Sequence, residues 1–295
     1  MADLLTIDRL GVGLRAPPFT PLVRDVSLAI GEGEVRGLVG MSGAGKSMVG
    51  KAILGILPHS ATIVRGRILF AGEDLAAASA DRRRELMGRS IALIPQDPFT
   101  SLNPTRRIEA QMTDVLRLRL GLARHAARHR ALELLEAVRI RDAAAVLRRF
   151  PHELSGGMRQ RILIANAFAL EPRLIVADEP TTALDVTIQK RILRLIRDLQ
   201  TLHRTALLFI SHDLGVVAKI CDTVSVIEAG MIVEQAPAGE IMARPRHPFT
   251  RALFAAMPRY DRPDLTLAPV PPAIRAAIAA DAEASDRAMG RRGSP

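Results

Sequence analysis

The chain has 295 residues, a formal net charge of +10 at pH 7 and an apolar content that is mostly aliphatic, because only 3% of its residues are aromatic. This length allows one large or two smaller domains, and the aliphatic content is typical of buried parallel strands covered by helices. A single cysteine, Cys221, excludes an intramolecular disulfide and any all-cysteine metal site within one chain, and it favours a reducing cytoplasm.

The chain shows no signal of its own for export or membrane insertion. The start, Met1-Ala2-Asp3-Leu4, lacks the basic and apolar segments of a secretory leader. No stretch of eighteen apolar residues is present, so we expect no membrane-spanning helix. The arginines at 82–84 and between 117 and 130 suggest either contact with nucleic acid or an anionic membrane, or a solvated helix face. Interleaved aromatics that could stack on single strands are absent from the sequence.

The first predicted elements, within residues 4–35, are short antiparallel strands separated by turn signals. Phe19 is the only aromatic residue there, and it is either an adenine-stacking residue or a core residue.

A phosphate-binding motif of the form G-x-x-x-x-G-K-S follows the predicted strand at residues 35–39 and precedes a predicted helix at residues 48–57. Its glycines allow successive backbone N–H groups to converge on a phosphate at a helix N-terminus. Lys46 is expected to contact the β- and γ-phosphates, and the Ser47 hydroxyl to bind Mg²⁺. The expected nucleotide-binding residues here are Gly40, Ser42, Gly43, Ala44, Gly45, Lys46 and Ser47.

A strand, a loop, a short helix and a second strand are predicted between residues 66 and 94, and Gln96 follows directly. Helices are then predicted at residues 107–118 and 124–138. Ser155 is expected to cap a helix that extends to about Leu170.

Two carboxylates, Asp178 and Glu179, follow four apolar residues at a predicted strand end, which is the edge where ligands bind in parallel α/β sheets. A helix is predicted at residues 187–202, with apolar residues at helical spacing. Another buried strand at residues 206–210 precedes His212.

The motifs of this chain, in their order, resemble those of the nucleotide-binding subunit of ABC transporters. They are the phosphate loop, Gln96, the Leu-Ser-Gly-Gly-Met-Arg-Gln-Arg run at 154–161, Asp178-Glu179, Ala183-Leu184-Asp185 and His212. The resemblance covers about residues 4–258. It implies an α/β phosphate-loop NTPase core of the ABC ATPase type, with an N-terminal antiparallel β portion and an inserted α-helical subdomain. The implied boundaries are an ATPase domain at 1–240, its helical subdomain at about 97–170, and a C-terminal extension at 241–295.

The resemblance also assigns roles. Asp178 would bind Mg²⁺ together with Ser47 and Gln96, Glu179 would be the general base, and His212 would contact the γ-phosphate and the attacking water. Ser155, Gly156 and Gly157 would complete the ATP pocket of an opposite subunit, and Asp185 would tune that interface. ATP hydrolysis would then require a dimer.

Finer patterns resemble the dipeptide, oligopeptide and nickel importers: residues 94–98 and 101–104, residues 178–189, and His247-Pro248-Phe249-Thr250-Arg251. They imply a second related ATPase subunit, two integral membrane permeases, a periplasmic or lipid-anchored binding protein, and a peripheral place on the cytoplasmic face of the inner membrane. Peptide is the expected cargo, with nickel or a metal chelate as the alternative. A nucleic-acid or ribosome-associated ABC ATPase is a third class, but we expect no nucleic-acid partner.

The C-terminal extension departs from many peptide-importer ATPases because it has no cysteine cluster. It carries several prolines and then an alanine-rich stretch. We expect it to be partly ordered, with a frayed end.

Overall fold

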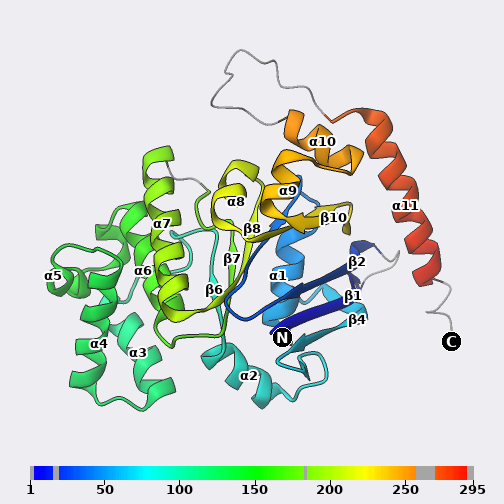
Figure 1. Ribbon diagram of the computed structural model, residues 1–295. Helices are drawn as coiled ribbons and strands as arrows, with labels where there is room; N and C mark the ends of the chain where they lie inside the picture. Colours follow the sequence, from blue (N-terminus) through cyan, green and yellow to red (C-terminus); the bar gives the residue numbers. More distant parts are fainter. Residues whose placement is uncertain (1–2, 16–19, 183–184, 257–269, 291–295) are drawn as a thin grey trace. The chain divides into compact units, whose positions relative to one another are not determined.

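The structure is a computed structural model that describes residues 3–15, 20–182, 185–256 and 270–290 (Figure 1). The chain divides into a terminal unit, Met1–Ala78 with Leu208–Pro295, and a central unit, Ser79–Leu207. The boundary at residue 207 falls inside strand β8 (Ala206–Ser211).

The terminal unit is built on a mixed sheet with the strand order β5-β4-β1-β2-β10-β9-β3. β1 pairs antiparallel with β2 and β4, so the prediction of antiparallel strands before the phosphate loop is correct. β3 pairs parallel with β9, and β9 and β10 form an antiparallel hairpin. These strands are β1 (Leu5–Leu14), β2 (Pro21–Ile30), β3 (Val35–Val39), β4 (Ala61–Phe70), β5 (Glu73–Asp74), β9 (Thr223–Glu228) and β10 (Met231–Pro237).

Helix α1 directly follows the phosphate loop and runs from Lys46 to Leu54, so it starts and ends earlier than the sequence indicates. Gly55 ends it with a φ of 66°, and its N–H donates to the carbonyls of Lys51 and Ala52. This left-handed cap stops the helix three residues before Pro58. The other helices of this unit are α8 (Leu214–Ile220), α9 (Ala238–Ala243), α10 (Pro248–Ala255) and α11 (Pro272–Gly290).

Helix α11 packs against the rest of the terminal unit through a small apolar face. Ile278 and Ala282, four residues apart, are almost completely buried, and Asp286 continues the same face. The carboxylate of Asp286 accepts two hydrogen bonds from the guanidinium of Arg24 on β2, at 2.8 and 3.1 Å. The alanine-rich stretch of the extension is therefore a docked helix.

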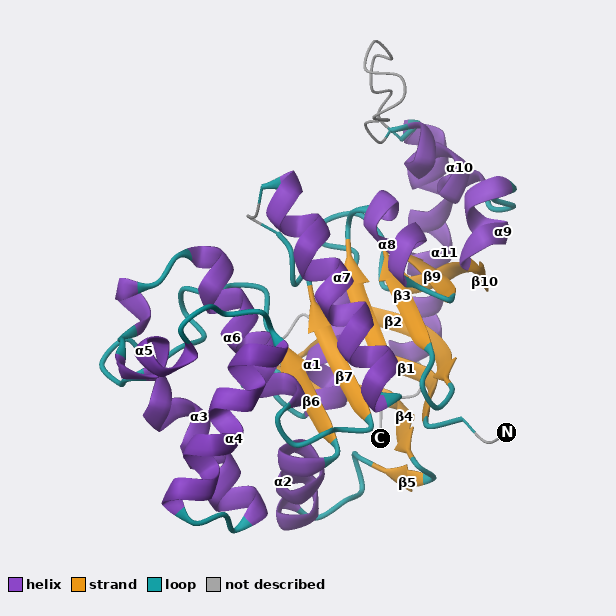
Figure 2. Cartoon of the chain, turned by 60° about the vertical axis from the view of Figure 1, so that its left-hand side comes forward, coloured by secondary structure: helices purple, strands orange, loops and turns teal. Residues whose placement is uncertain are grey.

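The central unit combines a parallel strand pair with a group of helices (Figure 2). β6 pairs with β7, Ile91 opposite Leu174, and α3 to α6 gather on one side of this pair in Figure 2. Its elements are α2 (Ala80–Arg89), β6 (Ile91–Ile94), α3 (Ile108–Leu120), α4 (Arg124–Ala137), α5 (Ala143–Arg148), a 3₁₀ turn (Pro151–Glu153), α6 (Gly156–Phe168), β7 (Leu174–Asp178) and α7 (Val186–His203). Across the described ranges, no helix has the length and apolar character that a membrane crossing requires.

Candidate functional site

The phosphate loop links β3 to α1 inside the terminal unit, and its glycines meet two different demands. Gly43 and Gly45 have φ values of 83° and 102°, which side-chain-bearing residues rarely adopt. Gly40 is constrained by space, because a Cβ there would lie 2.0 Å from the carbonyl oxygen of Ile227. The loop therefore combines a left-handed turn with close packing against β9.

The loop ends at the N-terminus of α1, where no side-chain hydrogen bond caps the helix. Its first N–H groups and the helix dipole together favour an anion. Lys46 is 95% buried, and its Nζ donates to the carbonyl oxygens of Gly40 and Met41 at 3.0 and 2.9 Å. A buried ammonium folded over its own loop is a suitable phosphate ligand, because the positive charge is held within the turn.

Glu228, at the end of β9, carries the other notable charge of this region. Burial raises the pKa of Glu228, and the positive charges of Arg275 and Lys46 oppose that rise. Its Oε2 atom is buried without a hydrogen-bond partner. Sequence patterns give no functional signal for Glu228 beyond its position at the end of a mostly buried strand.

In the central unit, Glu179 and Gln96 come together. The Nε2 of Gln96, after β6, donates to the Oε2 of Glu179, after β7, at 3.1 Å. The Thr182 hydroxyl donates to the same oxygen at 2.9 Å. Glu179 has a φ of 46°, and the N–H of Thr182 donates to its carbonyl at 3.1 Å. A left-handed non-glycine residue costs about 1 kcal/mol or more, so this turn holds the carboxylate in place at an energetic cost.

The signature run begins helix α6 as predicted. The Ser155 side chain accepts from the N–H of Met158 at 3.4 Å, and Gly156 and Gly157 form the first turn. The Phe99 ring lies beside Gly156, where a Cβ would be in van der Waals contact with Cζ of Phe99 at 3.4 Å. The guanidinium carbon of Arg159 lies 4.5 Å from the centre of the same ring. The segment after Gln96 therefore packs against the signature helix.

The remaining predicted site residues occupy element ends. Asp178 is the last residue of β7, and Asp185 caps α7 by accepting from the N–H of Ile188 at 2.8 Å. His212 follows β8 and is exposed in the terminal unit. Phe19, Ala183 and Leu184 lie outside the described residues. Thr182, which lies within the segment 178–189 but has no role implied by the resemblance, donates a hydrogen bond to Glu179.

These features define a phosphate-loop ATPase, and comparison with known proteins assigns its class. The family described as "ABC transporter" matches residues 23–182, and "Oligopeptide/dipeptide transporter, C-terminal region" matches residues 233–282. The ATP-binding cassette MJ0796, solved as a dimer bound to ADP and Pi, has a TM-score of 0.71 at 22% identity, covering 79% of this chain and 98% of that one. The predicted α/β ABC ATPase fold is confirmed.

The chain belongs to the ABC transporter family and is an ATP-binding, ATP-hydrolysing subunit. Subunits of this kind dimerise and work with membrane permeases. The "Probable D,D-dipeptide transport ATP-binding protein DdpD" of Escherichia coli is 47% identical over 84% of this chain and 76% of that protein. The "Dipeptide transport ATP-binding protein DppD" of the same species is 42% identical over 91% of this chain and 82% of that protein.

Proposed function

We propose that this chain hydrolyses ATP to power the import of peptides across a bacterial inner membrane. The observation that carries the cargo assignment is the match of residues 233–282 to the C-terminal region of oligopeptide and dipeptide transporters. Relatives named for dipeptide transport at 42–47% identity support it. The subunit would lie on the cytoplasmic face of the membrane and hold no cargo itself.

The phosphate loop is proposed to bind the triphosphate. Its backbone N–H groups and the ammonium of Lys46 would neutralise the β- and γ-phosphates. Ser47, Gln96 and Asp178 supply hydroxyl, amide and carboxylate oxygens, the hard donors that Mg²⁺ prefers. Bound there, Mg²⁺ would neutralise charge on the phosphate oxygens.

Glu179 is proposed as the general base, which accepts a proton from the attacking water. The donors from Gln96 and Thr182 both reach Oε2, so two side chains hold the carboxylate in a defined orientation toward that water. His212 would donate a hydrogen bond to the γ-phosphate. A general base of this kind contributes about 10²- to 10⁴-fold in rate.

A second, related ATPase subunit is the proposed partner at the N-terminus of α6. Ser155, Gly156 and Gly157 would contact the γ-phosphate of ATP bound to that partner, and Asp185 would lie at the same interface. ATP would thereby hold two subunits together, and hydrolysis would release them.

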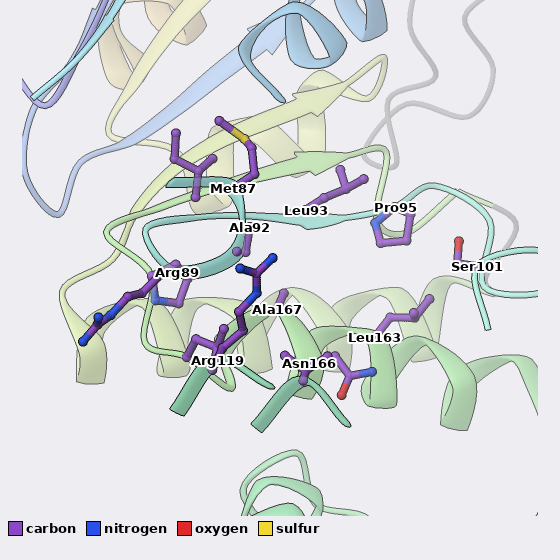
Figure 3. Close-up of a pocket in the computed structure, with 15 residues that line it drawn as sticks. Met87, Arg89, Ala92, Leu93, Pro95, Ser101, Arg119, Leu163, Asn166 and Ala167 are labelled. Carbon is purple, nitrogen blue, oxygen red and sulfur yellow. The ribbon is translucent and has the colours of Figure 1, made fainter. Parts of the chain in front are cut away.

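The permeases are proposed to dock in a cavity of about 570 Å³ in the central unit. Apolar side chains from β6, α3 and α6 line it, among them Leu93 and Leu163 (Figure 3). The polar side chains of the lining are Arg89, Ser101, Arg119 and Asn166. An apolar groove rimmed by a few polar groups fits an amphipathic helix. Pro95 also lines this cavity, so the docking site adjoins Gln96 and, through it, Glu179.

The test is the ATPase rate of the assembled transporter with cargo-loaded binding proteins. We expect stimulation by a peptide-loaded binding protein, and loss of that stimulation with Glu179→Gln while ATP binding persists. Stimulation only by a nickel-loaded protein would replace peptide by the metal alternative. Unchanged hydrolysis by the Glu179→Gln complex would refute the assignment of the base.

A further inference from the structure

Helix α11 is connected to the phosphate loop by a continuous set of hydrogen bonds within the terminal unit. The first link is the bidentate pair between Asp286 on α11 and Arg24 on β2, at 2.8 and 3.1 Å. The side chain of Arg24 is 19% exposed and that of Asp286 is 29% exposed, so both are mostly buried. A partly buried, bidentate pair has a fixed geometry and is stronger than an exposed one.

The second link joins Arg24 to the turn between β9 and β10. The Nη1 of Arg24 donates to the carbonyl of Ala229 at 2.7 Å, and its backbone N–H donates to the carbonyl of Gly230 at 2.8 Å. Ala229 and Gly230 have φ values of 48° and 77°, which are typical of a tight hairpin turn. Arg24 therefore fixes a turn whose conformation is strained at Ala229.

The third link joins that turn to the phosphate loop. The N–H of Gly230 donates to the carbonyl of Ala44 at 3.0 Å. Space around the contact is tight, because a Cβ on Gly45 would lie 2.8 Å from the Leu22 carbonyl and one on Gly230 would lie 3.0 Å from Cα of Val23. A displacement of the turn therefore moves the loop.

A longer-range electrostatic effect relates the other half of α11 to the same region. Burial raises the pKa of Glu228, which directly precedes the turn, and the positive charges of Arg275 on α11 and Lys46 in the loop oppose that rise. Two positions on α11, eleven residues apart, thus act on the hairpin end that supports the phosphate loop.

We propose that Asp286 is a positioning residue for ATP binding: α11, held by Arg24, keeps the turn and the phosphate loop in the conformation that accepts the triphosphate. This inference rests on the proposed assignment of ATP to the loop. Coupling is reciprocal, so ATP must in turn strengthen the docking of α11.

The experiment measures affinity for a fluorescent ATP analogue in the full chain, together with the unfolding temperature of the nucleotide-free protein. We expect Asp286→Ala to weaken binding about 5- to 10-fold, within the usual range of site coupling. Asp286→Asn, which keeps one acceptor, should fall between this variant and wild type. Glu283→Ala on the exposed side of the same helix is the matched control and should bind normally.

A double-mutant cycle with Arg24→Ala tests whether Asp286 acts on the phosphate loop through Arg24. Asp286→Ala should add little to Arg24→Ala if it acts through that arginine, whereas additive losses would overturn the proposal. Amide exchange supplies a readout that a purely structural role would not change: addition of ATP should slow exchange in α11 of wild type and not of Asp286→Ala.

The variant Lys46→Ala distinguishes the assignment of ATP to the phosphate loop from the role of Asp286. Normal binding by both variants would refute the assignment of ATP to the loop, and with it this inference. Loss of binding by Lys46→Ala together with wild-type affinity of Asp286→Ala would overturn only the role of α11. If Asp286→Ala does not fold, the graded response of Asp286→Asn decides the outcome.

Discussion

Glu179 shows how a single residue is prepared for its proposed role. Its carboxylate receives donors from Gln96 and Thr182 at the same oxygen, and its backbone is in the left-handed region. Both features restrict where the second oxygen points. A base held in position before the reaction avoids reorganisation in the transition state.

Thr182 provides the sharpest test at this scale. We expect Thr182→Val, which keeps the shape but removes the hydroxyl donor, to lower kcat about tenfold, the effect of losing a charge-assisted hydrogen bond of about 1.4 kcal/mol. Affinity for ATP should stay unchanged, because the phosphate loop is untouched. Steady-state ATPase kinetics measure kcat, and equilibrium binding of a fluorescent ATP analogue measures the affinity.

Thr182→Ser is the control for that variant, because it restores the hydroxyl. A wild-type kcat for Thr182→Val would mean that the carboxylate is oriented without the Thr182 hydroxyl. A raised KM with unchanged kcat would contradict the positioning role and place Thr182 in substrate binding.

At this scale the sequence predicts residue types better than their contacts. The order of Lys46, Asp178, Glu179 and His212 is sufficient to indicate phosphate chemistry. The bonds to Glu179 are not predictable from spacing, because Gln96 lies 83 residues away and meets it only where β6 and β7 pair. The role of Gly40 was predicted as backbone freedom, but the structure shows close packing against Ile227.

Among the elements, β10 and α10 are joined by Glu234. One of its carboxylate oxygens accepts the N–H of Arg246 at 2.7 Å, and the other accepts that of His247 at 3.0 Å. Burial raises the pKa of Glu234, but the hydrogen bonds outweigh it, so the pKa lies below its ordinary value. Glu234 thus orders the segment that leads into α10.

The lowered pKa fixes the sign of a pH dependence. Because the folded state holds the proton more weakly than the unfolded state, the stabilisation is present at neutral pH and is lost as the pH falls through the folded-state pKa. Glu234→Gln should destabilise the protein by about 1 kcal/mol at neutral pH. The difference from wild type should shrink as the pH falls through the lowered pKa of Glu234, below which both side chains are neutral.

Denaturant unfolding at several pH values measures this effect. Glu240→Gln is the control, since the side chain of that glutamate forms an exposed pair with Arg246 at 3.4 Å. A difference between Glu234→Gln and wild type that is constant with pH would contradict the role of the charge.

The elements that the sequence predicts correctly carry strong local signals. Helix α7 repeats Ile192, Leu195, Ile196 and Leu199 at helical spacing, and all four are buried. Helix α11 has a weaker signal, because exposed alanines such as Ala276, Ala277 and Ala280 surround its buried face, so the pattern does not separate the two faces. Its docking depends on Ile278, Ala282 and the pair between Asp286 and Arg24, residues 262 positions apart, which no local pattern contains.

For the whole molecule, the central question is how ATP turnover is coupled to a membrane partner. The cavity bounded by β6, α3 and α6 adjoins the segment that carries Gln96. That segment is itself ordered by Asp97, which accepts the N–H of Phe99 at 2.7 Å and the Thr100 hydroxyl at 2.9 Å. A permease helix bound in the cavity would therefore contact an ordered segment that is linked to Glu179 through Gln96.

This coupling is tested with Val115, which lines the cavity from α3. We expect Val115→Glu to abolish copurification with the permeases while leaving ATP affinity of the isolated chain unchanged, because a carboxylate in the groove must lose its water when a permease helix docks, even where Arg119, four residues further along α3, pairs with it. Leu118→Glu is the matched control: it lies on the same helix, is 82% exposed and does not line the cavity. Equal copurification of both variants would exclude the cavity as the docking site. Loss of copurification with Leu118→Glu alone would place the interface on the exposed face of α3. The segment after Gln96 would then respond to the permease only through movement of α3.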